Sequence, residues 1–205
     1  MPIKETILTI LQDAQLILPP TFIWQALAAV PDKIIPPYWN DWLSDPGSLT
    51  QRLIEASANR FAVEVIDQVE TTPTASEAQA LNIGCDTPVY SRQVLLHGNG
   101  EPWVFARSIM PLSTLTGRLE FLRDIDTQPL GALLFRDPSM TREPVEAAFL
   151  SIERAHLPDR LSHIKGPLWG RRSVFRLDQK PLLVSEIFLP KFKPYNQHPS
   201  LGFST

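Results

Sequence analysis

PVYSRQVLLHGNGEPWVFARSIMP, residues 88–111, is the stretch that decides the fold, because it has the pattern of a β-hairpin. Two runs rich in aliphatic and aromatic residues flank Gly98, Asn99 and Gly100. Glycine and asparagine tolerate the positive φ angles that a tight reversal of the chain demands. The stretch therefore predicts a strand, a turn and a second strand.

Two arginines of this hairpin fall where apolar side chains are expected. Side chains alternate between the two faces of a strand, so every second residue shares a face. The predicted apolar neighbours are Tyr90, Val94 and Leu96 for Arg92, and Trp103, Phe105 and Ile109 for Arg107. A guanidinium does not lose its proton, so burial of either arginine demands an anionic partner.

A second hairpin carries a misplaced acid. Residues 173–177 and 181–189 read as strands around Asp178 and Gln179, and Glu186 has apolar neighbours on both faces of its strand. A carboxylate there must be paired, bound to a ligand or kept protonated. Two interpretations have equal weight, a structural ion pair with Arg92 or Arg107 and a functional site.

The rest of the chain predicts short helices and one further strand. Helical spacing is found at 3–11, 22–30, 49–56, 115–122 and 130–135, and a half-buried strand at 61–69. Ser48 is a suitable N-cap for one helix, and Thr74 with Glu77 fits a capping box for another. Residues 140–157 fit either a helix or a strand.

These elements favour an α+β fold, a single domain with an antiparallel β-sheet flanked by helices. The 205 residues, 43% of them hydrophobic, are sufficient for one sizeable core. We expect the domain to span 1–190, with 1–40 as a helical N-terminal extension and 191–205 as a flexible tail. The aromatic group around Trp39 and Trp42 is expected to join the core.

Composition excludes several classes of protein. A net charge of −3 without a basic cluster argues against nucleic acid or an anionic membrane surface as partner. No apolar run has transmembrane length, so no membrane insertion is expected. The N-terminal stretch lacks an apolar run with a cleavage site, which makes the cytoplasm the expected location. Cys85 is the only cysteine, so an intrachain disulfide is impossible.

Common catalytic and binding motifs do not occur. The four histidines have no metal-ligand spacing with one another or with Cys85, so no metal is expected. Neither a Gly-rich phosphate loop nor a G-x-S-x-G elbow is present. Arg171 and Arg172 form either an anion site or a brace for the sheet, and the brace is favoured because such charges are mostly paired or solvated.

Three stretches resemble chorismate lyase, also called chorismate pyruvate-lyase. They are GEPWVFARSIMPLSTLTG (100–117), PLGALLF followed by SMTR (129–142), and LWGRRSVFRLDQKPLLVSEIFLP (168–190). The resemblance implies a chorismate lyase-like fold and a carbon–oxygen lyase that eliminates enolpyruvate from chorismate to give 4-hydroxybenzoate and pyruvate. It also implies a role in ubiquinone or plastoquinone biosynthesis, and no metal or redox cofactor.

The same resemblance implies which residues meet the substrate. The product pocket is expected at Leu49, Arg92, Leu130 and Glu186, with methionine in better-known members at the position of Leu49. Arg92 and Glu186 are expected to be catalytic, Arg92 as a clamp for a carboxylate and Glu186 as partner of the 4-hydroxyl and acceptor of the C4 proton. Arg107 or Arg142 is a candidate for the second carboxylate.

Alternative interpretations also follow from the resemblance. Effector domains of some transcription regulators have a similar fold, so a non-catalytic sensor of small aromatic acids is the alternative function. A sensor normally needs a DNA-binding domain, and no helix-turn-helix or basic face precedes Phe61. A scaffold with a decayed site is a weaker alternative. We expect the protein to act as a monomer.

Overall fold

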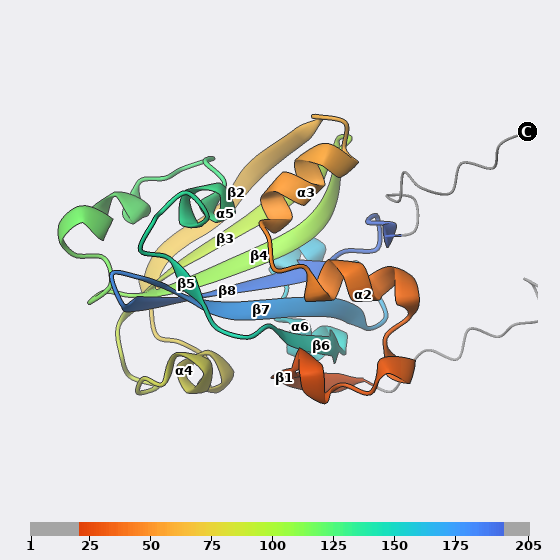
Figure 1. Ribbon diagram of the computed structural model, residues 1–205, viewed down its shortest axis with the longest axis horizontal. Helices are drawn as coiled ribbons and strands as arrows, with labels where there is room; N and C mark the ends of the chain where they lie inside the picture. The colour runs from red at the N-terminus through yellow and green to blue at the C-terminus, as the bar shows by residue number, and fades with distance from the viewer. Residues whose placement is uncertain (1–20, 195–205) are drawn as a thin grey trace, which may run out of the picture.

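An antiparallel β-sheet forms the centre of the computed structural model, which describes residues 21–194 (Figure 1). The strands are β1 (Phe22–Ala26), β2 (Phe61–Thr71), β3 (Val89–Gly98), β4 (Glu101–Pro111), β5 (Thr141–Arg142), β6 (Glu146–Leu150), β7 (Leu168–Leu177) and β8 (Lys180–Phe188). Within the described part they form an eight-stranded sheet in the order β1-β6-β7-β8-β4-β3-β2, and β5 also pairs with β7.

Helices cover both faces of this sheet, which confirms the predicted α+β class. They are α2 (Pro37–Ser44), α3 (Leu49–Ala56), α4 (Ala75–Leu81), α5 (Leu130–Leu134) and α6 (Ile152–Ala155), with short 3-10 helices η1 (Leu27–Ala29), η2 (Asp32–Ile34), η3 (Gly117–Arg123) and η4 (Asp159–Leu161). In Figure 1, α2, α3 and α5 lie on the near side of the sheet and α6 lies behind it. The core is therefore divided between two layers, one on each side of the strands.

Both predicted hairpins are confirmed. Asn99 (φ 56°) and Gly100 (φ 82°) turn the chain between β3 and β4. Asp178 (φ 48°) and Gln179 (φ 65°) do the same between β7 and β8. Two successive residues with positive φ make the type I′ turn, whose twist matches that of the strands it joins.

The predicted alternation along β4 is wrong at Trp103. The register of the β3–β4 ladder shifts after the pair Leu96–Val104, so Trp103 is an extra residue in its strand. Its ring is buried in the same core cluster as Val104, on the opposite side of the sheet from Phe105. Gly98 leaves room for the ring, because a Cβ there would lie 2.3 Å from it.

The caps predicted from sequence are confirmed. The Ser48 hydroxyl accepts a hydrogen bond from the Gln51 N–H at the start of α3. At the start of α4, the Thr74 hydroxyl accepts from the Glu77 N–H, and the Glu77 carboxylate accepts from the Thr74 N–H at 2.9 Å. Each cap satisfies backbone donors that the first helical turn leaves free.

The helix predicted at 22–30 is wrong, because β1 occupies most of that segment and pairs with β6. Pairing at the edge of a sheet overrides local helical spacing. Residues 140–157, which fitted either state, contain β5, β6 and then α6. The run at 115–122 forms η3 rather than an α-helix.

The flexible tail was expected to begin at residue 191, but residue 192 is packed into the core. Phe192 is only 2% exposed, and its ring centroid lies 4.7 Å from that of Trp42 and 5.1 Å from that of Phe188. Trp42, at 1% exposed, also confirms the predicted aromatic contribution to the core. Residues 195–205 and the helix predicted at 3–11 lie outside the described residues.

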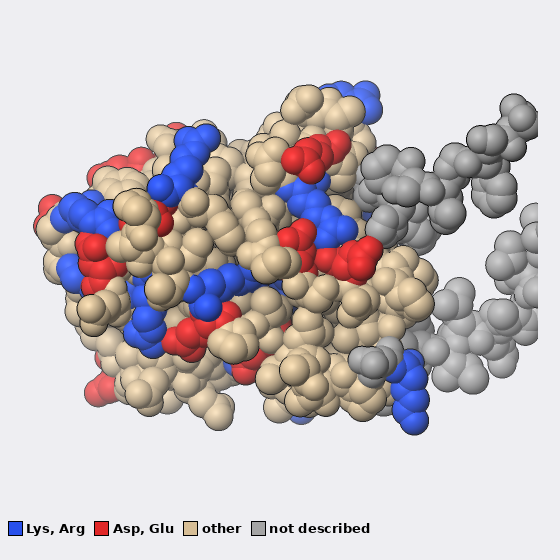
Figure 2. Space-filling view, viewed as in Figure 1, with Lys and Arg blue, Asp and Glu red and all other residues tan. Residues whose placement is uncertain are grey.

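Charged side chains of both signs are mixed over the face seen in Figure 2. Arg118 bridges two carboxylates, with its Nη1 2.6 Å from Asp137 and its Nε 2.5 Å from Asp178. Hydrogen bonding to Arg118, and then to Ser139, holds the pKa of the Asp137 carboxyl well below its usual range. These contacts tie the β7–β8 turn to the segment before β5.

Candidate active site

The register of the sheet brings Arg92 and Glu186 to one face. Arg92 in β3 pairs with Ser108 in β4, and Glu186 in β8 pairs with Ala106, two residues away along β4. Paired residues share a face of a sheet, and so do residues two apart on one strand. The two misplaced charges, predicted on separate hairpins, therefore project to the same side.

Arg92 is a buried cation without an anionic partner among residues 21–194. The residue is 2% exposed, and its Nη2 donates to the backbone carbonyls of Asp126 at 2.5 Å and Gln128 at 3.1 Å. Its Nε–H has no hydrogen-bond partner in the described part of the chain. Burial lowers the pKa of this guanidinium. An uncompensated buried guanidinium with a free donor is suited to an anionic ligand.

Glu186 is paired, but not with the residue suggested by the sequence. Its Oε2 lies 2.7 Å from the Nε of Arg171, which is 1% exposed as a residue. The Nη1 of Arg171 also donates to the carbonyls of Trp42 at 3.0 Å and Asp45 at 3.2 Å. The hypothesis that Glu186 neutralises Arg92 or Arg107 is therefore wrong. The favoured role of Arg171 as a brace is confirmed, because it joins β7, β8 and the end of α2.

The other candidate arginines have partners of their own. Arg107 projects to the opposite face, where its Nε lies 2.7 Å from the carboxylate of Glu77. Arg172 pairs with Glu146 at 2.6 Å on that same face. Arg142 donates from Nη1 to three carbonyls of the loop 45–47. Burial lowers the pKa of the Arg142 guanidinium. The negative charge of Glu186 lies near enough to offset part of that effect.

A narrow cavity joins Arg92 and Glu186. Its volume is about 20 Å³, which is room for a single water molecule. Thr50 and Ser108 contribute hydroxyls to its wall. The remaining lining residues are Val63, Val94, Leu96, Ala106, Pro129, Leu130, Gly131 and Val184.

The first turns of α3 and α5 cover this cavity. Thr50 lies at the start of α3, and Leu130 lies at the start of α5, immediately after Pro129. A Cβ at Gly131 would lie 2.9 Å from the Thr50 Oγ1, so only glycine lets the two helices approach this closely. The segments that cover the cavity are therefore the first turns of α3 and α5, and not a long loop.

Three of the four predicted pocket positions, Arg92, Leu130 and Glu186, line this cavity. Leu49 does not. It is 2% exposed and packs in the core cluster that contains Trp42, while the neighbouring Thr50 faces the cavity. Sequence reasoning missed Thr50 and Ser108. Ser108 could have been found, because it pairs directly with Arg92 in the first hairpin.

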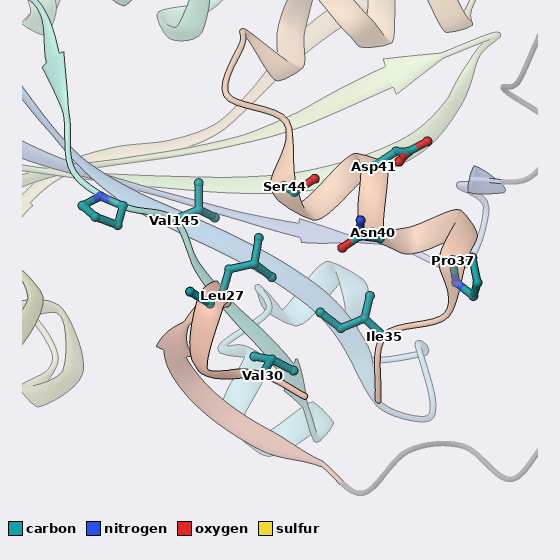
Figure 3. Close-up of a pocket in the computed structure, with 10 residues that line it drawn as sticks. Leu27, Val30, Ile35, Pro37, Asn40, Asp41, Ser44 and Val145 are labelled. Carbon is teal, nitrogen blue, oxygen red and sulfur yellow. The ribbon is translucent and has the colours of Figure 1, made fainter. Parts of the chain in front are cut away.

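A larger hollow of about 830 Å³ lies between η1, η2 and α2 (Figure 3). Leu27, Val30 and Ile35 form its apolar side, and Asn40 and Ser44 face it from α2. No lysine or arginine is among its lining residues. The hollow therefore lacks the cation that an acidic ligand requires, unlike the cavity at Arg92.

Between residues 21 and 194, no three His, Cys, Asp or Glu side chains gather closely enough to hold a metal ion. In the same part of the chain, no helix is long and apolar enough to cross a membrane.

Comparison with known proteins identifies the family. The family model described as "Chorismate lyase" matches residues 18–198. A "Probable chorismate pyruvate-lyase" of Psychromonas ingrahamii is 42% identical over 153 residues, which are 73% of this chain and 81% of that relative. Another, from Marinobacter nauticus, is 35% identical over 195 residues, 93% of this chain and 96% of the relative.

A likeness is also found among solved structures. The C-terminal domain of the histidine utilization repressor from Pseudomonas syringae pv. tomato has a TM-score of 0.47 and 16% sequence identity, over 71% of this chain and 99% of that chain. The family match, by contrast, spans most of this sequence, including the segments that carry Arg92, Leu130 and Glu186. The chain belongs to the chorismate lyase family.

Proposed function

We propose that this protein is a chorismate pyruvate-lyase, which converts chorismate into 4-hydroxybenzoate, a quinone ring precursor, and pyruvate. The observation that carries the proposal is the buried Arg92, whose Nε–H is unpaired in a cavity shared with the carboxylate of Glu186. Membership of the family supports catalysis over the alternative of a non-catalytic sensor.

Arg92 binds the ring carboxylate of chorismate in this proposal. Its Nη2 is fixed by two backbone carbonyls, so the orientation of the guanidinium is set before the ligand arrives. The Nε–H remains free for one charge-assisted hydrogen bond to the carboxylate. The ligand supplies the ion-pair partner that Arg92 lacks among the described residues.

Glu186 acts at the other end of the ring. Arg171 engages Oε2, and no described residue hydrogen-bonds to Oε1, which is available to the 4-hydroxyl and the C4 hydrogen of the substrate. The proton leaves C4 for Glu186 while the bond from C3 to the ether oxygen breaks, and its electron pair departs with enolpyruvate. Enolpyruvate then takes up a proton at carbon and becomes pyruvate.

The reaction relies on position and charge. Loss of the C4 hydrogen and the ether makes the ring aromatic, which provides the thermodynamic drive. A site for this step must hold the substrate in the reactive conformer and stabilise charge on the leaving oxygen. The hydroxyls of Thr50 and Ser108 are placed to supply neutral hydrogen bonds within the same cavity.

Entry of the substrate requires the cover to move. A volume of about 20 Å³ does not hold an aromatic ring. The helix starts that carry Thr50 and Leu130 are the covering segments, so their separation opens the site. Closure over the substrate would then exclude water from the charged groups, which strengthens their interactions.

The test is to incubate the purified protein with chorismate and follow 4-hydroxybenzoate and pyruvate. We expect equal amounts of both from the natural protein. Glu186→Ala should lower turnover by about 10²–10⁴-fold, the usual contribution of a positioned general base. Arg92→Ala should lose about 10-fold or more through its charge-assisted hydrogen bonds. Arg136→Ala, a change of an exposed arginine outside the cavity, is the matched control.

Circular dichroism separates loss of chemistry from loss of fold. Full turnover by either site variant would refute the assignment of Arg92 and Glu186. Binding of 4-hydroxybenzoate by the natural protein without any turnover of chorismate would instead favour the sensor.

The proposal also includes the setting of the reaction. The protein acts as a monomer in the cytoplasm and independently of nucleic acid. The net charge of −3 and the mixture of charges on the face seen in Figure 2 support the independence from nucleic acid. Light scattering of the purified chain tests the monomer, and a dimer mass would contradict it.

A further inference from the structure

A second cavity lies on the opposite face of the sheet, back to back with the candidate active site. Its volume is about 200 Å³, compared with about 20 Å³ for the cavity at Arg92. Ser185 and Ile187 line it, and both flank Glu186, whose side chain projects to the other face. The start of α4 and the end of α6 contribute its two sides.

The interior of this back cavity is apolar and partly aromatic. Phe105 is 1% exposed, and Leu150 and Ile187 are each 2% exposed. Trp24 closes one side, and the guanidinium of Arg172 lies 4.9 Å from the centroid of its ring. A volume below the usual 300–1,000 Å³ of drug-sized ligand sites limits the occupant to a small molecule, about one ring in size.

Three arginines surround that apolar interior, and each keeps donors that described residues do not use. Arg107 directs Nε and Nη2 to Glu77, which leaves Nη1. Arg172 directs Nε to Glu146 and Nη1 to Ser76, which leaves Nη2.

Arg154, the third arginine, is exposed at the rim, and within residues 21–194 it forms no hydrogen bond or ion pair. The carboxylates of Glu77 and Glu146 balance Arg107 and Arg172. Among the charged residues that line the cavity and their ion-pair partners, one positive charge, that of Arg154, is therefore left over. A monoanion matches that single excess charge, whereas a phosphate ester with its nearly two negative charges exceeds it.

We propose that the back cavity binds a small aromatic monocarboxylate, with its ring against Phe105 and Ile187 and its carboxylate toward Arg154 and the free donors of Arg107 and Arg172. The inference does not depend on the proposed function, because it concerns residues on the other face of the sheet.

The experiment measures binding of radiolabelled benzoate by equilibrium dialysis. Arg92→Ala removes the cation of the candidate active site, and we expect this variant to retain one benzoate site. Adding Arg154→Glu should weaken the remaining binding by about tenfold or more, since a charge-assisted hydrogen bond is lost and a repulsion is introduced. Adding Arg136→Glu instead makes the same charge change on another exposed arginine and should leave binding unchanged.

Competitors test the class of ligand. Unlabelled benzoate should displace the label, whereas benzamide, which has the ring without the charge, and inorganic phosphate should not. Displacement by phosphate alone would overturn the choice of a carboxylate. The proposal is also overturned if folded Arg92→Ala binds no benzoate, or if Arg154→Glu leaves its binding unchanged. None of these readouts uses turnover, so failure of this inference and failure of the proposed function are distinguishable.

Discussion

Replacing Arg171 by methionine should destabilise the fold more than any surface charge change, because it leaves Glu186 buried without its cation. The pair has an N–O distance of 2.7 Å, and its side chains are 2% and 16% exposed. Removing one partner of a buried pair costs about 3–5 kcal/mol. At about 2–4 °C per kcal/mol for a chain of this length, the melting temperature should fall by roughly 6–20 °C.

The chain contains a matched control for that change. Arg123 also lies 2.7 Å from a glutamate, Glu70, but the two side chains are 35% and 56% exposed. Exposed pairs contribute about 0–1 kcal/mol, so Arg123→Met should lower the melting temperature by no more than about 4 °C. The two pairs have the same N–O distance and differ in burial, and Arg171 also loses its hydrogen bonds to the carbonyls of Trp42 and Asp45.

Urea unfolding followed by tryptophan fluorescence measures both variants, and a double-mutant cycle isolates the pair. Glu186→Gln alone should also destabilise the protein, because it leaves Arg171 buried and unpaired. The double variant should lose less than the sum of the single losses, with a coupling of about 0.5–3 kcal/mol. Two results would refute the importance of burial at this pair. One is that the losses are additive, and the other is that Arg171→Met has a free energy of unfolding as high as that of Arg123→Met.

Three further predictions concern other parts of the molecule. Phe192→Ala should cost about 3–5 kcal/mol in urea unfolding, and a loss below about 1 kcal/mol would mean that the end of the chain is not docked. Gly131→Ala should reduce kcat/KM for chorismate by up to about 100-fold, since its Cβ displaces the cover of the cavity, and unchanged kinetics would contradict this. The folded pKa of Asp137 is depressed, so its stabilisation is present above the unfolded pKa of ~3.9 and is lost as pH falls from there through the folded pKa. Calorimetry should therefore show Asp137→Asn less stable than the natural protein at pH 7, with the difference shrinking below about pH 4, and a constant difference would disprove the linkage.

Local chemistry explains why both hairpins and the helix caps were predictable from sequence. Asn99 and Gly100 adopt a conformation that few other residues tolerate, and Thr74 with Glu77 form a reciprocal cap that needs no distant partner. Glu186 stood out for a similar reason, because an acid among apolar neighbours is visible without knowledge of the fold.

Contacts made over long sequence distances explain most of what was not predictable. The pairing of β1 with β6 joins residues more than a hundred positions apart, and local spacing at 22–30 gives no sign of it. Arg171 and Glu186 meet only through the register of β7 and β8. Thr50, rather than Leu49, faces the cavity because of the rotation of α3 about its own axis against the sheet. The helical repeat in the sequence does not determine that rotation.

The two carbonyls that hold Arg92 have a consequence for natural variation. Both belong to the backbone of residues 126 and 128, so neither hydrogen bond depends on the identity of the side chain. Position 128 is then free to change among related proteins. Position 126 is restricted by its φ of 42°, which favours Asp, Asn or Gly, and the negative charge of Asp126 also offsets part of the burial that lowers the pKa of Arg92. A survey of relatives that ranks positions by invariance would therefore find Arg92 but overlook the loop that orients it.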